Sequence, residues 1–98
     1  LYNASFLNRE MSEKALEILS KADSKQGIPA RLPADIIVSH KSGERMLTGS
    51  PQIQLHDCGI IYYSNTPYLL CIMTKGDNID NLDKVIADVS EIVYQNIK

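Results

Sequence analysis

The sequence predicts an α+β fold in which an antiparallel three-stranded sheet is flanked by an N-terminal helix and a long C-terminal helix. Two observations lead to this prediction. Apolar residues recur at helical spacing near both ends of the chain, and three runs rich in β-branched and aromatic residues lie between them. The 98 residues are 44% hydrophobic and 22% charged, which is ordinary globular composition, so we treat residues 1–98 as a single segment.

Both predicted helices are amphipathic. The first is predicted over residues 12–23 with Ser12 as its N-cap, and the second over residues 81–97 with Asp80 or Asn81 as its N-cap. The apolar positions that define their buried faces are Ala15, Ile18, Leu19 and Ala22 in the first helix and Leu82, Val85, Ile86, Val89, Val93 and Ile97 in the second.

The three predicted strands cover residues 35–41, 53–63 and 68–74. Residues 42–52 contain two glycines and a proline and are predicted to form a loop. The polar segment 64–67 is short enough to join the last two strands as an antiparallel hairpin.

The last two strands are almost continuously apolar, which is typical of a sheet covered on both faces. Two helices are too few to cover both, so residues such as Ile60, Leu70 and Ile72 become candidates for exposure. We therefore expect these residues to be part of a larger domain, in which a missing N-terminal segment or another chain covers the sheet.

Charge and hydropathy exclude several kinds of partner. The formal net charge is -2, and the lysines and arginines form no basic stripe, so nucleic acid is not expected to bind. No apolar run reaches the roughly 18 to 20 residues that span a bilayer. The first residues also lack the basic start and apolar run of a signal peptide.

Histidines and cysteines leave some alternatives open. Cys58 and Cys71 lie in apolar runs and are predicted to be buried free thiols, and His40 is predicted to be an exposed polar residue at a strand end. His56 and Asp57 form a possible general base with its orienting acid, and His40, His56 and Cys58 form a possible zinc site. Their spacing matches no recognised metal motif, so neither a metal nor another cofactor is expected.

Several features together resemble the C-terminal part of the penicillin-recognising serine hydrolases, which include class A β-lactamases and D-alanyl-D-alanine peptidases. They are Lys41-Ser42-Gly43 closing a strand, a following loop, Gly59-Ile60-Ile61 in a hairpin, and a terminal amphipathic helix. The approach to the first strand, residues 30–35, is similar to the leucine-proline-alanine approach in many class A enzymes. The resemblance covers nearly the whole chain and rests mainly on the order of the elements.

The resemblance implies a role for each motif residue. Lys41 would supply positive charge beside the nucleophile, Ser42 would bind the substrate carboxylate, and Gly43 would let the substrate lie along the strand edge. The backbone N–H of Glu44 would be one donor of the oxyanion hole. In the complete protein the ligand would be a β-lactam or a peptidoglycan peptide, and the location would be extracytoplasmic, in the secreted fraction or the cell envelope.

The chain departs from the family pattern in three ways. An acidic Glu44 follows the motif, and Cys58 stands where several β-lactamases carry an arginine that holds the substrate carboxylate. The other two family motifs, Ser-x-x-Lys and Ser-x-Asn, do not occur in the 98 residues. We therefore expect the chain by itself to be inactive. The alternative is a non-catalytic α/β binding or structural module derived from the same fold.

Overall fold

The computed structural model describes residues 2–21, 25–46 and 48–98. Its elements are, in chain order, α1 (Arg9–Ser20), β1 (Ile37–Met46), β2 (Ile53–Tyr62), β3 (Tyr68–Gly76) and α2 (Ile79–Ile97). The strands form one antiparallel sheet in the order β1-β2-β3. The predicted fold class is therefore confirmed.

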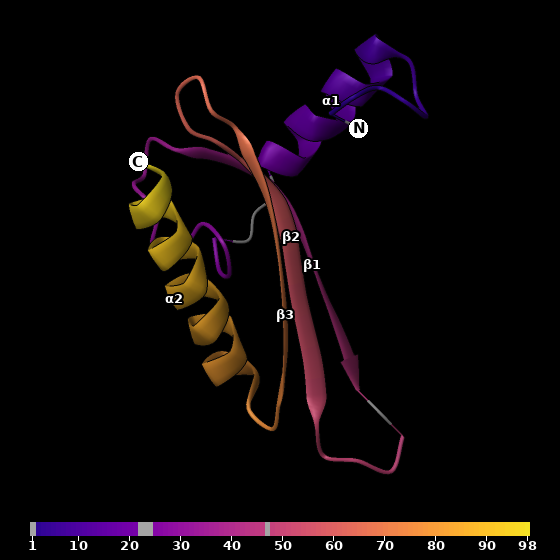
Figure 1. The fold of residues 1–98 in the computed structure, drawn as a ribbon. Coiled ribbons are helices and arrows are strands. Elements are labelled where there is room, and N and C mark those ends of the chain that lie inside the picture. Colours follow the sequence, from indigo (N-terminus) through magenta and orange to yellow (C-terminus); the bar gives the residue numbers. More distant parts are fainter. Residues whose placement is uncertain (1, 22–24, 47) are drawn as a thin grey trace.

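The two helices lie on opposite sides of the sheet (Figure 1). Helix α2 runs along one face and packs against β2 and β3, whereas α1 contacts β1 near one end of the other face. The hydrophobic core fills the space between the sheet, α2 and the segment before β1. Its buried members are Ile28, Leu32, Val38, Leu55, Ile61, Ile72, Leu82, Ile86 and Tyr94.

Helix α1 begins three residues before the predicted start. The side chain of Asn8 is the N-cap and accepts a hydrogen bond from the backbone N–H of Met11 at 2.8 Å. Ser12, the predicted cap, is buried inside the helix, where its hydroxyl donates to the carbonyl oxygen of Leu7. The last two residues of the predicted helix lie outside the described residues.

Helix α2 also begins earlier than predicted. Asn78 is its N-cap and accepts a hydrogen bond from the backbone N–H of Asn81 at 3.2 Å. Asp80 and Asn81 therefore belong to the first turn of the helix. The sequence offers several good capping side chains between residues 77 and 81, and helical periodicity alone does not choose among them. No described helix is long and apolar enough to span a membrane.

Strand β1 is longer than predicted. It was expected to end at Lys41, but it continues to Met46, and the register pairs Ser42 with Asp57. The predicted loop over residues 42–52 is therefore wrong for its first half, because pairing with β2 keeps these polar residues extended. Strands β2 and β3 lie within two residues of their predicted bounds.

One sheet face is only partly covered by the described residues. On β3, Leu69 and Met73 are 72% and 76% exposed, whereas Ile72 is buried and Leu70 packs against the core. The prediction that Leu70 and Ile72 are candidates for exposure is wrong, because alternate strand residues point to opposite faces and these two face α2. Ile60 is half-buried.

Candidate active site

The predicted site residues, Lys41 to Glu44, lie in the middle of β1, and all four are exposed. Strand β1 is at an edge of the sheet, and in the described part of the chain no other strand lies beyond it. An edge strand leaves a row of backbone N–H and C=O groups without a partner strand. The motif therefore lies where an extended ligand can approach both the side chains and the backbone.

Strand alternation separates the polar groups of the motif. Ser42 lies opposite Asp57, on the face toward α2, and Lys41 lies opposite Cys58, on the other face. The ammonium of Lys41 donates a hydrogen bond to the carbonyl oxygen of Ser42 at 2.7 Å. The motif thus presents a hydroxyl on one side of β1 and a cation on the other.

A cavity of about 380 Å³ adjoins the motif and is lined by residues 41–44, by Asp57 of β2 and by Asp83 of α2. Burial raises the pKa of the Asp83 carboxyl, and the nearby charges of Asp80, Asp57 and Glu44 raise it further. The lining of the cavity thus combines the carboxyl groups of Glu44, Asp57 and Asp83 with the cationic residue Lys41.

His40, next to the motif, is buried rather than exposed. Only 5% of its surface is accessible, and its Nδ1 lies 3.0 and 3.1 Å from the two carboxylate oxygens of Asp57, itself 1% exposed. The prediction of an exposed residue at a strand end is wrong because β1 continues past it and the side chain points toward α2. The structure thus reveals a buried His–Asp pair that the sequence reading missed.

His56 and Asp57 do not form the pair that their adjacency suggested. Consecutive strand residues point to opposite faces, so His56 lies on the face away from α2. Its Nδ1 has no hydrogen-bond partner among the described residues. The suggested zinc ligands are not gathered either, since the described part of the chain contains no group of three His, Cys, Asp or Glu side chains placed to hold a metal ion.

Cys58 and Cys71 form a disulfide. They face each other directly across β2 and β3 on the less covered side of the sheet, with Cys71 exposed. The prediction of buried free thiols is wrong, because the antiparallel register of the hairpin brings the two residues opposite each other. The disulfide could have been predicted only if the register of the hairpin had been known, because the register makes the two cysteines opposite partners.

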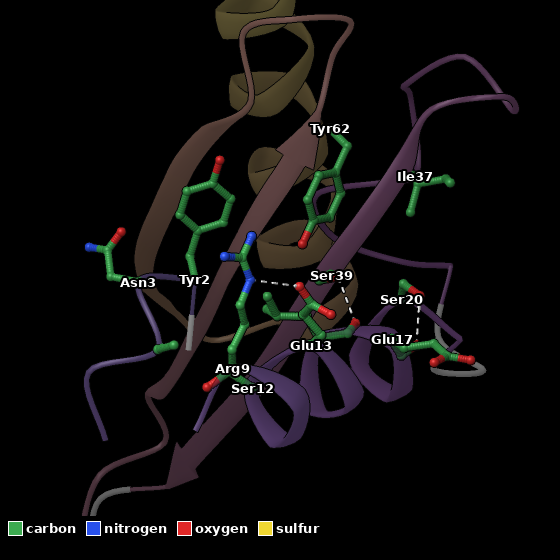
Figure 2. Close-up of a pocket in the computed structure, with 12 residues that line it drawn as sticks. Tyr2, Asn3, Arg9, Ser12, Glu13, Glu17, Ser20, Ile37, Ser39 and Tyr62 are labelled. Carbon is green, nitrogen blue, oxygen red and sulfur yellow. Dashed lines mark hydrogen bonds and ion pairs between the residues drawn. The ribbon is translucent and has the colours of Figure 1, made fainter. Parts of the chain in front are cut away.

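A larger cavity, of about 670 Å³, lies between α1 and one end of the sheet (Figure 2). Arg9 and Glu13, one turn apart on α1, form an ion pair at 3.3 Å, and the hydroxyl of Ser39 donates to the backbone of α1 at 2.8 Å. Tyr62 also lines it. Residues 41–44 are not part of its lining, so the larger hollow is separate from the predicted site.

The fold and the Lys-Ser-Gly motif on its edge strand define a fragment of the β-lactamase-like serine hydrolase class. The chain belongs to the Beta-lactamase enzyme family, whose family model matches residues 1–97. The family resemblance inferred from the sequence is therefore confirmed. Among curated proteins, none matches this sequence.

Solved structures similar to this one include a β-lactamase and two forms of PBP-A. A β-lactamase from Chitinophaga pinensis DSM 2588 is 19% identical with a TM-score of 0.82, and the match covers 99% of this chain and 37% of that protein. PBP-A is 19% identical with a TM-score of 0.76, with 98% and 35% covered. A PBP-A mutant, solved as an acyl-enzyme complex with penicillin G, is 20% identical with a TM-score of 0.74, with 98% and 35% covered.

These similarities show the fold of the chain and how much of each solved protein it matches. The 98 residues span between 35% and 37% of the length of the solved proteins. In each case they therefore align with one part of a larger domain, as the sequence predicted.

Proposed function

We propose that the protein is a serine acyl-transfer hydrolase that acts on β-lactams or on D-alanyl-D-alanine peptides of the cell wall. One observation carries the proposal: in a member of the Beta-lactamase enzyme family, Lys41-Ser42-Gly43 lies exposed on an edge strand beside a cavity. The acyl-enzyme complex of the similar PBP-A mutant with penicillin G supports this reaction type.

In the proposed mechanism, a serine supplied from outside residues 1–98 attacks the substrate carbonyl and forms an acyl-enzyme, which water then hydrolyses. Lys41 provides the positive charge beside that serine. The substrate lies along the open edge of β1, where Gly43 leaves room and the backbone N–H of Glu44 donates to the developing oxyanion. A single oxyanion donor of this kind typically contributes about 3 to 4 kcal/mol to lowering the barrier.

The charges around the motif bear on the proposed substrate preference. Ser42 would bind the substrate carboxylate, but Glu44 and Asp83 line the cavity on the same side of β1. Like charges within several ångströms of a bound carboxylate weaken its binding. We expect anionic β-lactams to bind less tightly than they would to a protein with a neutral residue at position 44.

The experiment is acylation of the full-length protein by a fluorescent penicillin, followed by gel fluorescence and mass spectrometry. We expect one covalent adduct, and we expect Lys41→Ala to lower the acylation rate at least tenfold without unfolding the protein. Lys75→Ala is the matched control, because Lys75 is also an exposed strand lysine but lies on β3, away from the motif. Unchanged acylation in folded Lys41→Ala would exclude a site role for Lys41. A full-length protein that never forms an adduct would favour the non-catalytic module.

We also propose an extracytoplasmic location. A disulfide persists in oxidising compartments and is rare in the cytosol, and the Cys58–Cys71 bridge supports this reading. Cell-wall peptides would be accessible there. Mass spectrometry of alkylated protein from cell fractions tests the location: the bridged form should be found outside the cytoplasmic membrane, and reduced protein confined to the cytoplasm would contradict it.

A further inference from the structure

The His40–Asp57 pair lies where the buried part of β1 ends and its exposed part begins. Val38, Ser39 and His40 are buried, whereas every residue from Lys41 to Met46 is exposed. The hydroxyl of Ser39 is bound to the backbone of α1 on one side of the strand, and the imidazole of His40 is bound to Asp57 on the other. The strand is therefore anchored on both faces immediately before the motif begins.

Asp57 connects β1 to the rest of the core. Besides its contact with His40, its Oδ2 accepts a hydrogen bond from the backbone N–H of Ile28 at 3.0 Å. The carbonyl oxygen of Ile28 in turn accepts from the hydroxyl of Ser90 on α2 at 2.9 Å. A continuous buried network thus runs from α2 through the segment before β1 and through β2 to the residue preceding Lys41.

Two glycines make room for the pair. Gly59 lies opposite His40, and a Cβ added there would lie 2.7 Å from the Cβ of His40. Gly27 has a φ of +77°, and a Cβ added there would collide with Oδ2 of Asp57. Each member of the pair is therefore packed directly against a backbone that lacks a side chain, which leaves it little freedom to move.

We propose that His40 and Asp57 are positioning residues, which hold the edge strand so that Lys41 and the backbone of Gly43 and Glu44 keep their geometry toward the substrate. This inference rests on the proposed acyl-transfer function. His40 and Asp57 are only 5% and 1% exposed, so neither offers much surface to a substrate, although Asp57 lies in the wall of the cavity beside the motif. Both act through β1, and misplacement of a catalytic group by about 1 Å costs up to roughly a hundredfold in rate.

The test compares variants that keep or break the link in the full-length protein. His40→Asn places an amide near the position of Nδ1 and can still donate to Asp57. The double variant His40→Leu/Asp57→Asn breaks the link and replaces the buried carboxylate of Asp57 by a neutral amide, which makes it the variant to use if His40→Leu alone does not fold. Thr74→Val is the control, because it removes a hydrogen bond of 2.8 Å within the sheet, from β3 to the carbonyl oxygen of Leu55 on β2, and leaves the His40–Asp57 link intact.

Two experiments are made on folded protein. Acylation kinetics with a fluorescent penicillin give the acylation rate constant and the dissociation constant. Hydrogen exchange reports how well the backbone amides of each strand are protected. In the double variant we expect acylation to slow at least tenfold and the dissociation constant to change by a smaller factor, because oxyanion donors act mainly in the transition state. Amides of β1 should exchange at least tenfold faster, with those of β3 unchanged. His40→Asn should stay within about threefold of the unmodified protein in both measurements.

The outcomes separate this inference from the proposed function. If the folded double variant acylates at the unmodified rate, or if its β1 amides exchange as before, the positioning role is overturned. If Thr74→Val slows acylation equally, the effect is general destabilisation, and the inference also fails. If the unmodified protein is never acylated but the double variant loosens β1 selectively, the proposed function fails, while the pair still holds the strand.

Discussion

At the scale of single residues, the side chains that matter most are paired across the sheet rather than along the chain. Sequence adjacency suggested His56 with Asp57, yet the partner of Asp57 is His40, which lies 17 positions away. Strand alternation makes neighbouring residues point apart, and antiparallel pairing brings distant residues together. Gly59 marks a position where an added side chain would collide with His40, whereas Gly43 marks a position where a side chain has room.

Gly59→Ala should destabilise the full-length protein by about 1 to 3 kcal/mol, because its Cβ would press on the Cβ of His40 and on the carbonyl oxygen of Ser39 at 3.0 Å. Gly43→Ala is the matched comparison, since nothing lies within 4 Å of its added Cβ. Its stability should change by no more than about 0.5 kcal/mol. Denaturant unfolding measures both, and equal losses would show that the close approach at Gly59 relaxes freely.

Asp83→Asn should stabilise the protein at neutral pH by no more than about 0.5 kcal/mol, because the carboxyl is only partly buried and solvent screens its charge. Burial first, and then nearby carboxylates, raise the pKa of Asp83 above its ordinary value of 3.8. A raised carboxyl pKa means that the folded state holds the proton more tightly than the unfolded state does. The contribution of this one group to stability is therefore greatest below pH 3.8 and is lost as the pH rises from 3.8 through the folded pKa.

The gain from Asp83→Asn should accordingly disappear as the pH falls below the ordinary aspartate range. Unfolding curves recorded at neutral pH and in acid check this. A gain of the same size at both pH values would show that it comes from packing and not from the removed charge.

At the scale of elements, the helices and the hairpin were predictable and the full length of β1 was not. Helical periodicity identified both helices, and apolar runs identified β2 and β3. The predicted buried faces of the helices are only partly right, because Leu82 and Ile86 of α2 are buried whereas Ile18 of α1 is 61% exposed. Residues 42–46 are polar and exposed, so they carry no burial pattern. Only pairing with β2 keeps them extended, and pairing is a property of two segments together.

The motif itself was found from the sequence, but its surroundings were not. Lys41 to Glu44 were predicted as site residues because the Lys-Ser-Gly triplet and the order of elements are visible in the sequence. The carboxylate-lined cavity, the His40–Asp57 pair and the disulfide depend on register and on side-chain direction. A single sequence states neither of these.

Removal of the disulfide by Cys58→Ser/Cys71→Ser should lower the stability of the full-length protein by about 2 to 3 kcal/mol, because the bridge closes a chain segment with a sequence separation of 13. The loss comes mainly from a less restricted unfolded chain. Denaturant unfolding of the double variant, compared with the oxidised protein, measures it. Reduction of the unmodified protein should give a similar loss, and an unchanged midpoint in both cases would contradict the prediction.

At the scale of the whole molecule, the described residues form two complete layers, the sheet and α2, and only part of a third layer on the other face of the sheet. One face of the sheet packs on α2, and α1 covers only part of the other (Figure 1). Ile37, Leu69 and Met73 are each more than half exposed on that second face. Burying a large aliphatic side chain is worth roughly 1.5 to 3 kcal/mol, which is substantial against the net stability of a small domain.

The 98-residue chain, produced alone, should therefore be ordered only when another copy or a complementary segment covers this face. It should also take no label from a fluorescent penicillin, because it lacks the Ser-x-x-Lys motif. Analytical ultracentrifugation combined with denaturant unfolding tests the first expectation. A monomer at micromolar concentration that unfolds cooperatively with several kcal/mol of stability would refute it and favour a self-standing module.

The bridge between Cys58 and Cys71 also makes strand alignment a covalent property. The two residues are directly opposite partners, so sliding β3 along β2 by even one position is incompatible with the bond. Such a slip would turn Ile72 outward and Met73 inward, because side chains alternate along a strand. An oxidised chain that loses its tertiary packing therefore keeps β2 and β3 in register. When it packs again, the same face of the hairpin can be buried without a change in strand alignment.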